Sequence, residues 1–128
     1  LRPQATRDYE TTRAYLELLH DEVKKSGSEL LVAYFSYRTV VERAARERFL
    51  SLRPGWDLKY DLDKPVRIVE EQLKELGIRY VDLNPRLEAA DAESPLPPLY
   101  FFHDGHWTPR SHEIVAATLH DVLKPMID

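Results

Sequence analysis

An acid and a histidine two residues apart are the side chains in this chain best suited to catalysis. Asp104 and His106 lie in the segment 102–109. Thr108 and Pro109 predict a helix start there, because Thr can cap a helix and Pro fits its first turn. A carboxylate beside an imidazole fixes the tautomer of the ring and stabilises its charged form, as general-base catalysis requires. The residues alone also allow a bland alternative, in which the pair only caps the following helix.

The chain offers no recognisable nucleophile to accompany this pair. It contains no cysteine, and none of its serines lies in a Gly-x-Ser-x-Gly or Gly-Asp-Ser pattern. Ser36 alone follows an apolar run typical of a buried strand, at the carboxyl end where α/β sheets carry their sites. We therefore name Ser36 as a pocket-lining, substrate-binding candidate. Trp107 is a second such candidate, with a packing role behind the loop as its alternative.

No metal or cofactor is expected from the sequence. His103, Asp104, His106 and His112 are residue types that bind zinc, but their spacing matches no metal motif. His112 also falls inside the predicted helix. The absence of cysteine excludes disulfides and thiolate ligands, and it leaves the cellular compartment undetermined.

Composition is that of an ordinary globular protein of 128 residues, with 43% hydrophobic and 31% charged residues and a net charge of −4. An acidic chain without a basic stripe is not expected to bind nucleic acid. The arginines between residues 43 and 48 alternate with glutamates and predict a solvated helix face. No apolar run reaches the ~18 residues of a membrane span. Because the chain begins at Leu1, we expect a processed or excised piece.

Hydrophobic periodicity and turn residues divide the chain into helices and strands. Helices are predicted over residues 8–26, 38–50, 63–76 and 109–123, with strands over 30–35 and 78–83 and mostly irregular structure over 51–61 and 84–99. The stripe of the first helix is predicted to contain Leu16, Leu19 and Val23. The run 30–35 is apolar throughout, which is typical of a strand buried on both faces.

Individual residues set the expected boundaries of these elements. Gly27 and Gly77 are predicted to end the first and third helices. Asp63 is predicted to cap the third helix, with Pro65 in its first turn. Pro125 is predicted to stop the last helix.

The alternation of helices and strands predicts an α/β fold with a short parallel sheet, in a single domain spanning residues 1–128. Only two strands are convincing, with 99–102 as a possible third. Two parallel strands cannot cover the apolar faces of four helices. We therefore expect the sheet to be completed by missing chain, by a second copy, or by another subunit.

The segment 104–112, Asp-Gly-His-Trp-Thr-Pro-Arg-Ser-His, resembles the last sequence block of the SGNH/GDSL hydrolases. In that block an Asp and a His precede a helix of small apolar residues. The segments 30–36, 77–83 and 99–101 also resemble parts of that family, although they are typical of α/β proteins in general. The resemblance covers most of the chain from about residue 12 onward.

This resemblance implies a serine esterase or acyltransferase on a flavodoxin-like three-layer fold, of which the chain would be an incomplete, C-terminal part. Asp104 would orient His106, and His106 would be the base that activates the serine. The substrate would be a small-molecule or carbohydrate ester. Ser111 stands where the family usually has Gly. The Gly-Asp-Ser nucleophile block and the Gly and Asn blocks of the oxyanion hole are absent, so these groups are expected outside this chain.

Two alternatives stay open from the sequence. Ordinary SGNH enzymes place the Asp-x-His block last, whereas relatives of the alginate O-acetylation proteins place it before the serine. The ending at residues 121–128 resembles a natural terminus and favours an upstream serine. The competing function is a non-catalytic α/β interaction module in which the site is vestigial.

Overall fold

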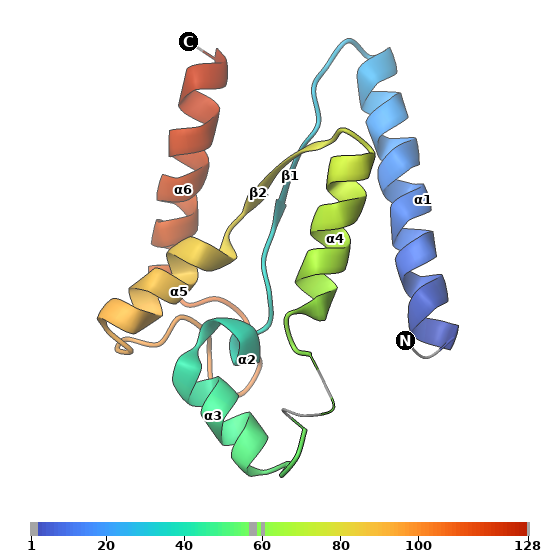
Figure 1. Cartoon of the computed structure of the whole chain (residues 1–128). Coiled ribbons are helices and arrows are strands. Elements are labelled where there is room, and N and C mark those ends of the chain that lie inside the picture. Colours follow the sequence, from blue (N-terminus) through green and yellow to red (C-terminus); the bar gives the residue numbers. More distant parts are fainter. Residues whose placement is uncertain (1–2, 57–58, 60, 128) are drawn as a thin grey trace. The chain divides into compact units, whose positions relative to one another are not determined.

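A computed structural model describes residues 3–56, 59 and 61–127, with side chains described from residue 6 onward. Figure 1 shows the elements in chain order. They are α1 (Pro3–Lys25), β1 (Leu31–Tyr34), α2 (Arg38–Val41), α3 (Arg43–Ser51), α4 (Lys64–Glu75), β2 (Arg79–Asp82), α5 (Asn84–Glu93) and α6 (Pro109–Ile127).

The chain forms two compact units. Unit 1 comprises Leu1–Val32 and Asp63–Tyr80, and unit 2 comprises Ala33–Leu62 and Val81–Asp128. The strands β1 and β2 pair in a short parallel sheet. Along the chain, each strand begins in unit 1 and ends in unit 2. The carboxyl ends of both strands, where α/β sheets usually carry functional groups, therefore belong to unit 2.

In unit 1, α1 packs against α4. Leu73, which lies on the predicted apolar stripe of α4, is fully buried. The Gln72 side-chain amide donates a hydrogen bond to the carbonyl oxygen of Tyr9 at 2.9 Å. Arg13 and Glu75 form an ion pair between the same two helices. The apolar contact and the polar contacts together fix these helices side by side.

The buried face of α1 differs slightly from the prediction. Leu16 and Val23 are half-buried as expected, but Leu19 is 49% exposed. His20 takes its place on the half-buried stripe, which positions 9, 13, 16, 20 and 23 form at alternating spacings of four and three residues.

In unit 2, α5 packs against both α2 and α6. The apolar core collects side chains from all three helices, from the end of β2 and from the segment before α6. Its buried members are Val41, Val81, Leu83, Leu87, Leu99, Tyr100 and Val115. Two members of this core, Leu99 and Tyr100, belong to the segment that leads to Asp104 and His106 and pair with Thr108 and Trp107 behind it.

Both strands are confirmed near their predicted positions, but the expectation that 30–35 is buried on both faces is wrong. Ala33 is exposed and the Phe35 side chain is 53% exposed. A two-stranded sheet leaves each strand with one unpaired edge and little cover. The apolar run is consistent with a sheet that other chain completes.

Two segments differ from their predicted conformation. The helix expected over 38–50 is divided at Glu42, whose backbone is extended (φ −87°, ψ 117°). The segment expected to be irregular contains α5. Pro85 lies in the first turn of α5, where a missing N–H costs nothing, and Leu87 and Asp91 are buried along it. The irregular structure begins only after Glu93, where the prolines concentrate.

The remaining differences concern single residues. Gly27 and Gly77 do follow the ends of α1 and α4. Asp63 precedes α4, with Pro65 in its first turn, but its side chain makes no capping hydrogen bond. Pro125 does not stop α6, which continues to Ile127. A proline removes one helical hydrogen bond without ending the helix when hardly a turn follows it.

The possible third strand is reduced to one antiparallel bridge between Tyr100 and Trp107. Within the described residues, none of the helices has the length and apolar character needed to cross a membrane.

Candidate functional site

The loop that holds Asp104 and His106 is closed by backbone hydrogen bonds at its base. The Phe101 N–H donates to the His106 carbonyl oxygen at 2.8 Å, and the Gly105 N–H donates to the Phe101 carbonyl oxygen at 3.1 Å. One step further out, the Thr108 N–H donates to the Leu99 carbonyl oxygen at 2.9 Å. These bonds fold residues 99–108 back on themselves. The two candidate catalytic residues therefore lie at the tip of a narrow, closed loop.

Gly105 lets the chain turn between the two candidate residues. Its φ of 70° lies in the left-handed region, which residues with a Cβ enter only at a cost. Since the acid and the histidine flank this position directly, the left-handed turn decides how their side chains face each other.

Asp104 contacts His106 in two ways through a single oxygen. The Asp104 Oδ1 atom accepts a hydrogen bond from the His106 backbone N–H at 2.9 Å. The Nδ1 atom of the His106 ring lies 3.4 Å from the same oxygen. The Asp104 side chain is 58% exposed and the His106 side chain is 82% exposed. The acid is therefore fixed relative to the histidine backbone, while the imidazole remains open to solvent on its other side.

These contacts stabilise the charged form of the acid. The backbone N–H of His106 is the largest cause that lowers the pKa of Asp104 below its ordinary value of 3.8. Attraction to the His106 imidazole lowers this pKa further. Asp104 therefore carries its negative charge at any pH at which an imidazole titrates.

The start of α6 is tied to the segment before the loop. The Ser111 hydroxyl donates to the Leu99 carbonyl oxygen at 2.5 Å, and Ser111 is fully buried. The Thr108 hydroxyl donates to the Pro98 carbonyl oxygen at 2.8 Å. Arg110 donates to three carbonyl oxygens, those of Ala90, Ser94 and Pro97. The Thr108 hydroxyl thus binds the segment before the loop.

Trp107 packs between aromatic neighbours beneath the loop. Its ring centroid lies 4.1 Å from that of Phe35 and 5.5 Å from that of His112. The indole Nε1 is buried. These contacts describe a side chain that supports the loop from behind.

Ser36 lies at the carboxyl end of β1, as expected, but it is 8% exposed. Its backbone N–H donates to the Asn84 side-chain oxygen at 2.8 Å, and its carbonyl oxygen accepts from the Tyr100 hydroxyl at 2.9 Å. Its Oγ atom is buried, without a hydrogen-bond partner in the described part of the chain. The structure therefore brings Ser36 to Tyr100, at the base of the loop, and makes its hydroxyl inaccessible.

Asn84 and Tyr100 were not singled out from the sequence, although both organise this end of the sheet. The Asp82 Oδ1 atom accepts from both the backbone and the side-chain N–H groups of Asn84, which turns the Asn84 oxygen toward Ser36. Burial raises the pKa of the Tyr100 hydroxyl, which therefore stays protonated as a donor. The signal for Asn84 is its place in an Asp-Leu-Asn-Pro turn directly after a strand.

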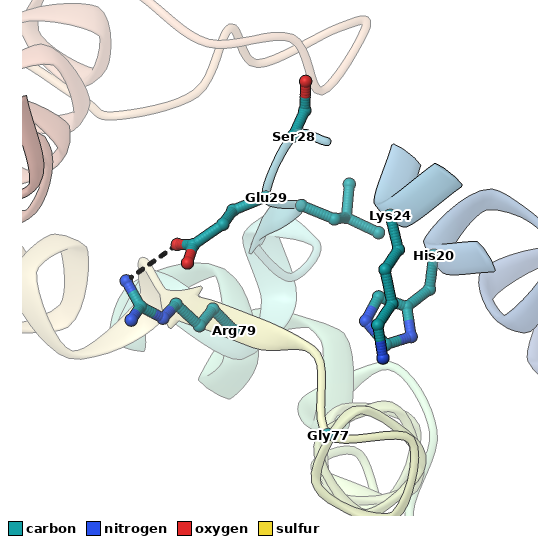
Figure 2. Close-up of a pocket in the computed structure, with 7 residues that line it drawn as sticks. His20, Lys24, Ser28, Glu29, Gly77 and Arg79 are labelled. Atoms are coloured by element: carbon teal, nitrogen blue, oxygen red, sulfur yellow. Dashed lines mark ion pairs between the residues drawn. The ribbon is translucent and has the colours of Figure 1, made fainter. Parts of the chain in front are cut away.

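A cavity of about 280 Å³ lies in unit 1, lined by residues of α1, of β2 and of the turns beside them. Glu29 and Arg79 form an ion pair at 3.2 Å across it. Figure 2 shows Ser28 pointing away from His20 and Lys24. Lys24 lies in the last turn of α1, where the helix dipole favours positive charge.

The described residues contain no group of three or more His, Asp or Glu side chains arranged to hold a metal ion. His112 lies within α6, and its ring contacts the Trp107 ring.

A short parallel sheet and an acid–histidine loop before the last helix are compatible with part of an SGNH-hydrolase-like domain. The comparison with known families agrees: residues 1–127 match the model of the ALGX family, described as "SGNH hydrolase-like domain, acetyltransferase AlgX", and the chain belongs to that family.

Curated relatives carry the same family name. The chain is 35% identical over 114 residues to the alginate biosynthesis protein AlgX of Azotobacter vinelandii, with 84% of this chain and 22% of the relative covered. It is 34% identical over 116 residues to AlgX of Pseudomonas putida, with coverages of 82% and 22%. AlgX of Pseudomonas aeruginosa is 33% identical over 112 residues, with coverages of 84% and 22%. The chain thus spans about a fifth of the length of these relatives. No solved structure gives a significant match.

Proposed function

We propose that this chain supplies the acid–histidine pair of an SGNH-type O-acyltransferase or ester hydrolase, whose serine nucleophile and oxyanion hole lie outside these 128 residues. The observation that carries the proposal is the contact of Asp104 Oδ1 with both the backbone N–H and the ring Nδ1 of His106. It agrees with the family match and with the Asp-x-His-Trp block at these residues. The chain is accordingly one part of a larger catalytic domain.

In the proposed mechanism, His106 removes the proton from the attacking serine hydroxyl. Asp104 faces Nδ1 and so leaves Nε2 free for the serine. A carboxylate in this place keeps the ring in the correct tautomer and stabilises the imidazolium that forms. The distance of 3.4 Å is longer than a strong hydrogen bond, as is common for catalytic pairs before substrate binds.

We propose that the serine follows this segment in the parent protein. This is the order that the resemblance implies for relatives of the alginate O-acetylation proteins, and the matched family is described as that of acetyltransferase AlgX. The expectation of an upstream serine rested on the ending of the chain, which is weaker ground than a family match. Ser36 is a poor nucleophile candidate, because its hydroxyl is buried.

The proposed substrate is an O-acyl ester of a carbohydrate, and acetyl is the proposed acyl group. The support is the description of the family as an acetyltransferase and the naming of the relatives as alginate biosynthesis proteins. Trp107 and Ser36 support the site from below in this proposal, since both are packed against the base of the loop.

The exposure of His106 favours one alternative. A side chain that is 82% exposed is also what a vestigial site in an interaction module would show. The catalytic proposal requires that the rest of the parent protein covers this imidazole, whereas the module requires no such cover.

The test uses the full-length parent protein and a chromogenic acetyl ester. His106→Ala should lower kcat/KM by about 10³-fold or more, because the reaction loses its general base. His103→Ala is the matched control in the same loop and should stay within about threefold of wild type. Full activity in His106→Ala would exclude the catalytic assignment. Equal losses in both variants would show damage to the loop and not loss of a base.

A further inference from the structure

A buried carboxylate separates α2 from α3. Glu42 is only 4% exposed, although Glu is almost never buried without partners. Its extended backbone ends α2 and starts α3, which interrupts a run of good helix formers. An interruption of this kind needs a compensating gain, since burying a carboxylate is costly unless it is paired and hydrogen-bonded.

The partners of this carboxylate lie at the base of the Asp104–His106 loop. Its Oε1 atom accepts the backbone N–H groups of Leu99 at 2.8 Å and Tyr100 at 3.1 Å. Its Oε2 atom accepts a hydrogen bond from the Arg38 guanidinium. The same guanidinium lies 5.0 Å from the ring centroid of Phe102, within the loop. Glu42 thus contacts the loop directly and, through Arg38, a second time.

Residues 99 and 100 form one side of the loop, and their other groups hold the opposite side. The Leu99 carbonyl oxygen accepts from the Thr108 N–H and from the Ser111 hydroxyl. Tyr100 forms the bridge with Trp107. An N–H group held by Glu42 fixes the plane of its peptide, and that plane determines where the neighbouring carbonyl points. The Glu42 carboxylate therefore orients the peptide groups at the base of the loop, whose carbonyl oxygens bind the opposite side of the loop.

We propose that Glu42 is a positioning residue, which holds the 99–100 segment by two charge-assisted backbone hydrogen bonds and thereby fixes the Asp104–His106 pair. The effect on catalysis rests on the proposed function, whereas the effect on loop order does not. Charged acceptors form the stronger class of hydrogen bond, and a pair misplaced by about 1 Å can cost about 10²-fold in rate.

Asp91 offers a matched control. It is also a buried carboxylate, 8% exposed, and it accepts the backbone N–H of Arg43 at 2.9 Å. Asp91, which lies in α5, therefore binds the junction between α2 and α3 at Arg43, the residue after Glu42. Removing Asp91 tests the cost of losing a buried carboxylate at this junction without removing the two bonds to residues 99 and 100.

The experiment compares Glu42→Ala, Glu42→Gln and Asp91→Ala in the full-length protein, by amide hydrogen exchange and by kinetics on a chromogenic acetyl ester. In Glu42→Ala, the amides of Phe101, Gly105 and Thr108 should exchange at least about tenfold faster, because the loop opens locally. Its kcat should fall about 10- to 100-fold while KM stays within about twofold, since binding groups elsewhere are intact.

Glu42→Gln should restore part of this loss, because its amide oxygen still accepts both N–H groups while its NH2 group cannot accept from Arg38. We expect its kcat to lie between those of Glu42→Ala and the wild type. Asp91→Ala should also lose thermal stability, while its loop exchange and kcat stay near wild type. If Glu42→Ala does not fold, Glu42→Asp replaces it, since the shorter side chain withdraws the carboxylate but keeps its charge.

Loop amides that exchange no faster in Glu42→Ala than in Asp91→Ala would overturn the proposal. A kcat that falls equally in Glu42→Ala and Asp91→Ala would do the same. A wild-type parent without esterase activity would instead count against the proposed function. In that case amide exchange alone still decides whether Glu42 orders the loop.

Discussion

In the acid–histidine pair, one carboxylate oxygen of Asp104 contacts both the backbone N–H and the ring of His106. The carboxylate is therefore placed by the backbone before the ring takes up any orientation. Gly105 between them supplies the left-handed turn that makes this possible. The titration of Asp104 and the replacement of Gly105 therefore test this geometry separately.

Asp104 should titrate below its ordinary pKa of 3.8, as followed by ¹³C NMR of its carboxyl group. Because the pKa is lowered on folding, the stabilisation is present above the unfolded value and is lost as pH falls through the folded one. The backbone N–H is the largest cause, so His106→Ala should keep most of the depression. A midpoint at or above 3.8 in the wild-type protein would contradict the observed contact.

Gly105→Ala should destabilise the fold by about 1–2 kcal/mol, because a Cβ is disfavoured at positive φ. A Cβ at Gly105 would meet no atom within 4 Å, so the cost is conformational and not steric. Gly55→Ala is the matched control, since Gly55 has a φ of 80° and equally open surroundings.

The two glycine variants should lose similar stability in urea denaturation, but only Gly105→Ala should also lose esterase activity in the parent. Equal activity in both variants would show that the turn does not position the pair.

At the level of elements, the sequence predicted those with strong periodicity and clear ends. The stripe of α4 with Gly77 behind it, and β2 directly after, are found where expected. The division at Glu42 was not predictable, because its cause is a partner 57 residues away in sequence, the Leu99 N–H. The helix α5 was not predicted, because the prolines at 95, 97 and 98 favoured irregular structure over the whole segment, although Pro85 suits the first turn of a helix.

In the candidate site, too, residues with a local sequence signal could be predicted and residues that act through distant contacts could not. Asp104 and His106 are close in sequence and belong to one local motif, so the sequence alone could single them out. Glu42, Asn84 and Tyr100 contribute through contacts between distant segments. Residues of this kind have no local signature, since their role depends on which segments the fold brings together.

The first turns of α6 are fixed to the loop by a buried hydroxyl. Ser111→Ala should cost about 1 kcal/mol, the usual net value of a hydrogen bond, because the Leu99 carbonyl oxygen loses one donor. Ser111→Gly, which restores the residue usual in the resembling family, should cost about a further 0.5–1 kcal/mol in helix propensity. Urea denaturation measures both.

Ser51→Ala is the control for these variants, since the Ser51 hydroxyl donates to the Arg48 carbonyl oxygen on an exposed helix end. It should be nearly neutral. A Ser111→Ala protein as stable as wild type would show that the hydroxyl contributes nothing to holding the loop.

At the level of the whole molecule, a two-stranded sheet is a small part of an α/β domain, and the chain spans 22% of the length of its relatives. We predict that the sheet is extended by further chain in the parent protein. The exposed Phe35 side chain and the half-buried residues of β1 are the surfaces that such an extension would cover.

Amide hydrogen exchange of β1 and β2 tests this prediction in the isolated chain and in the full-length parent. Protection of the strand amides should be at least about tenfold greater in the parent, because paired edges open less often. Sedimentation of the isolated chain shows whether a second copy takes the place of the missing strands. Equal protection in the parent and in a monomeric isolated chain would contradict the prediction.

The most direct test of the central claim is fluorophosphonate labelling of the parent protein and of this chain, followed by peptide mapping. The account predicts labelling of the parent at a serine outside these 128 residues, its loss in His106→Ala, and no labelling of this chain alone. Labelling of a serine within this chain, such as Ser36, or labelling of the parent that persists unchanged in His106→Ala, would contradict it.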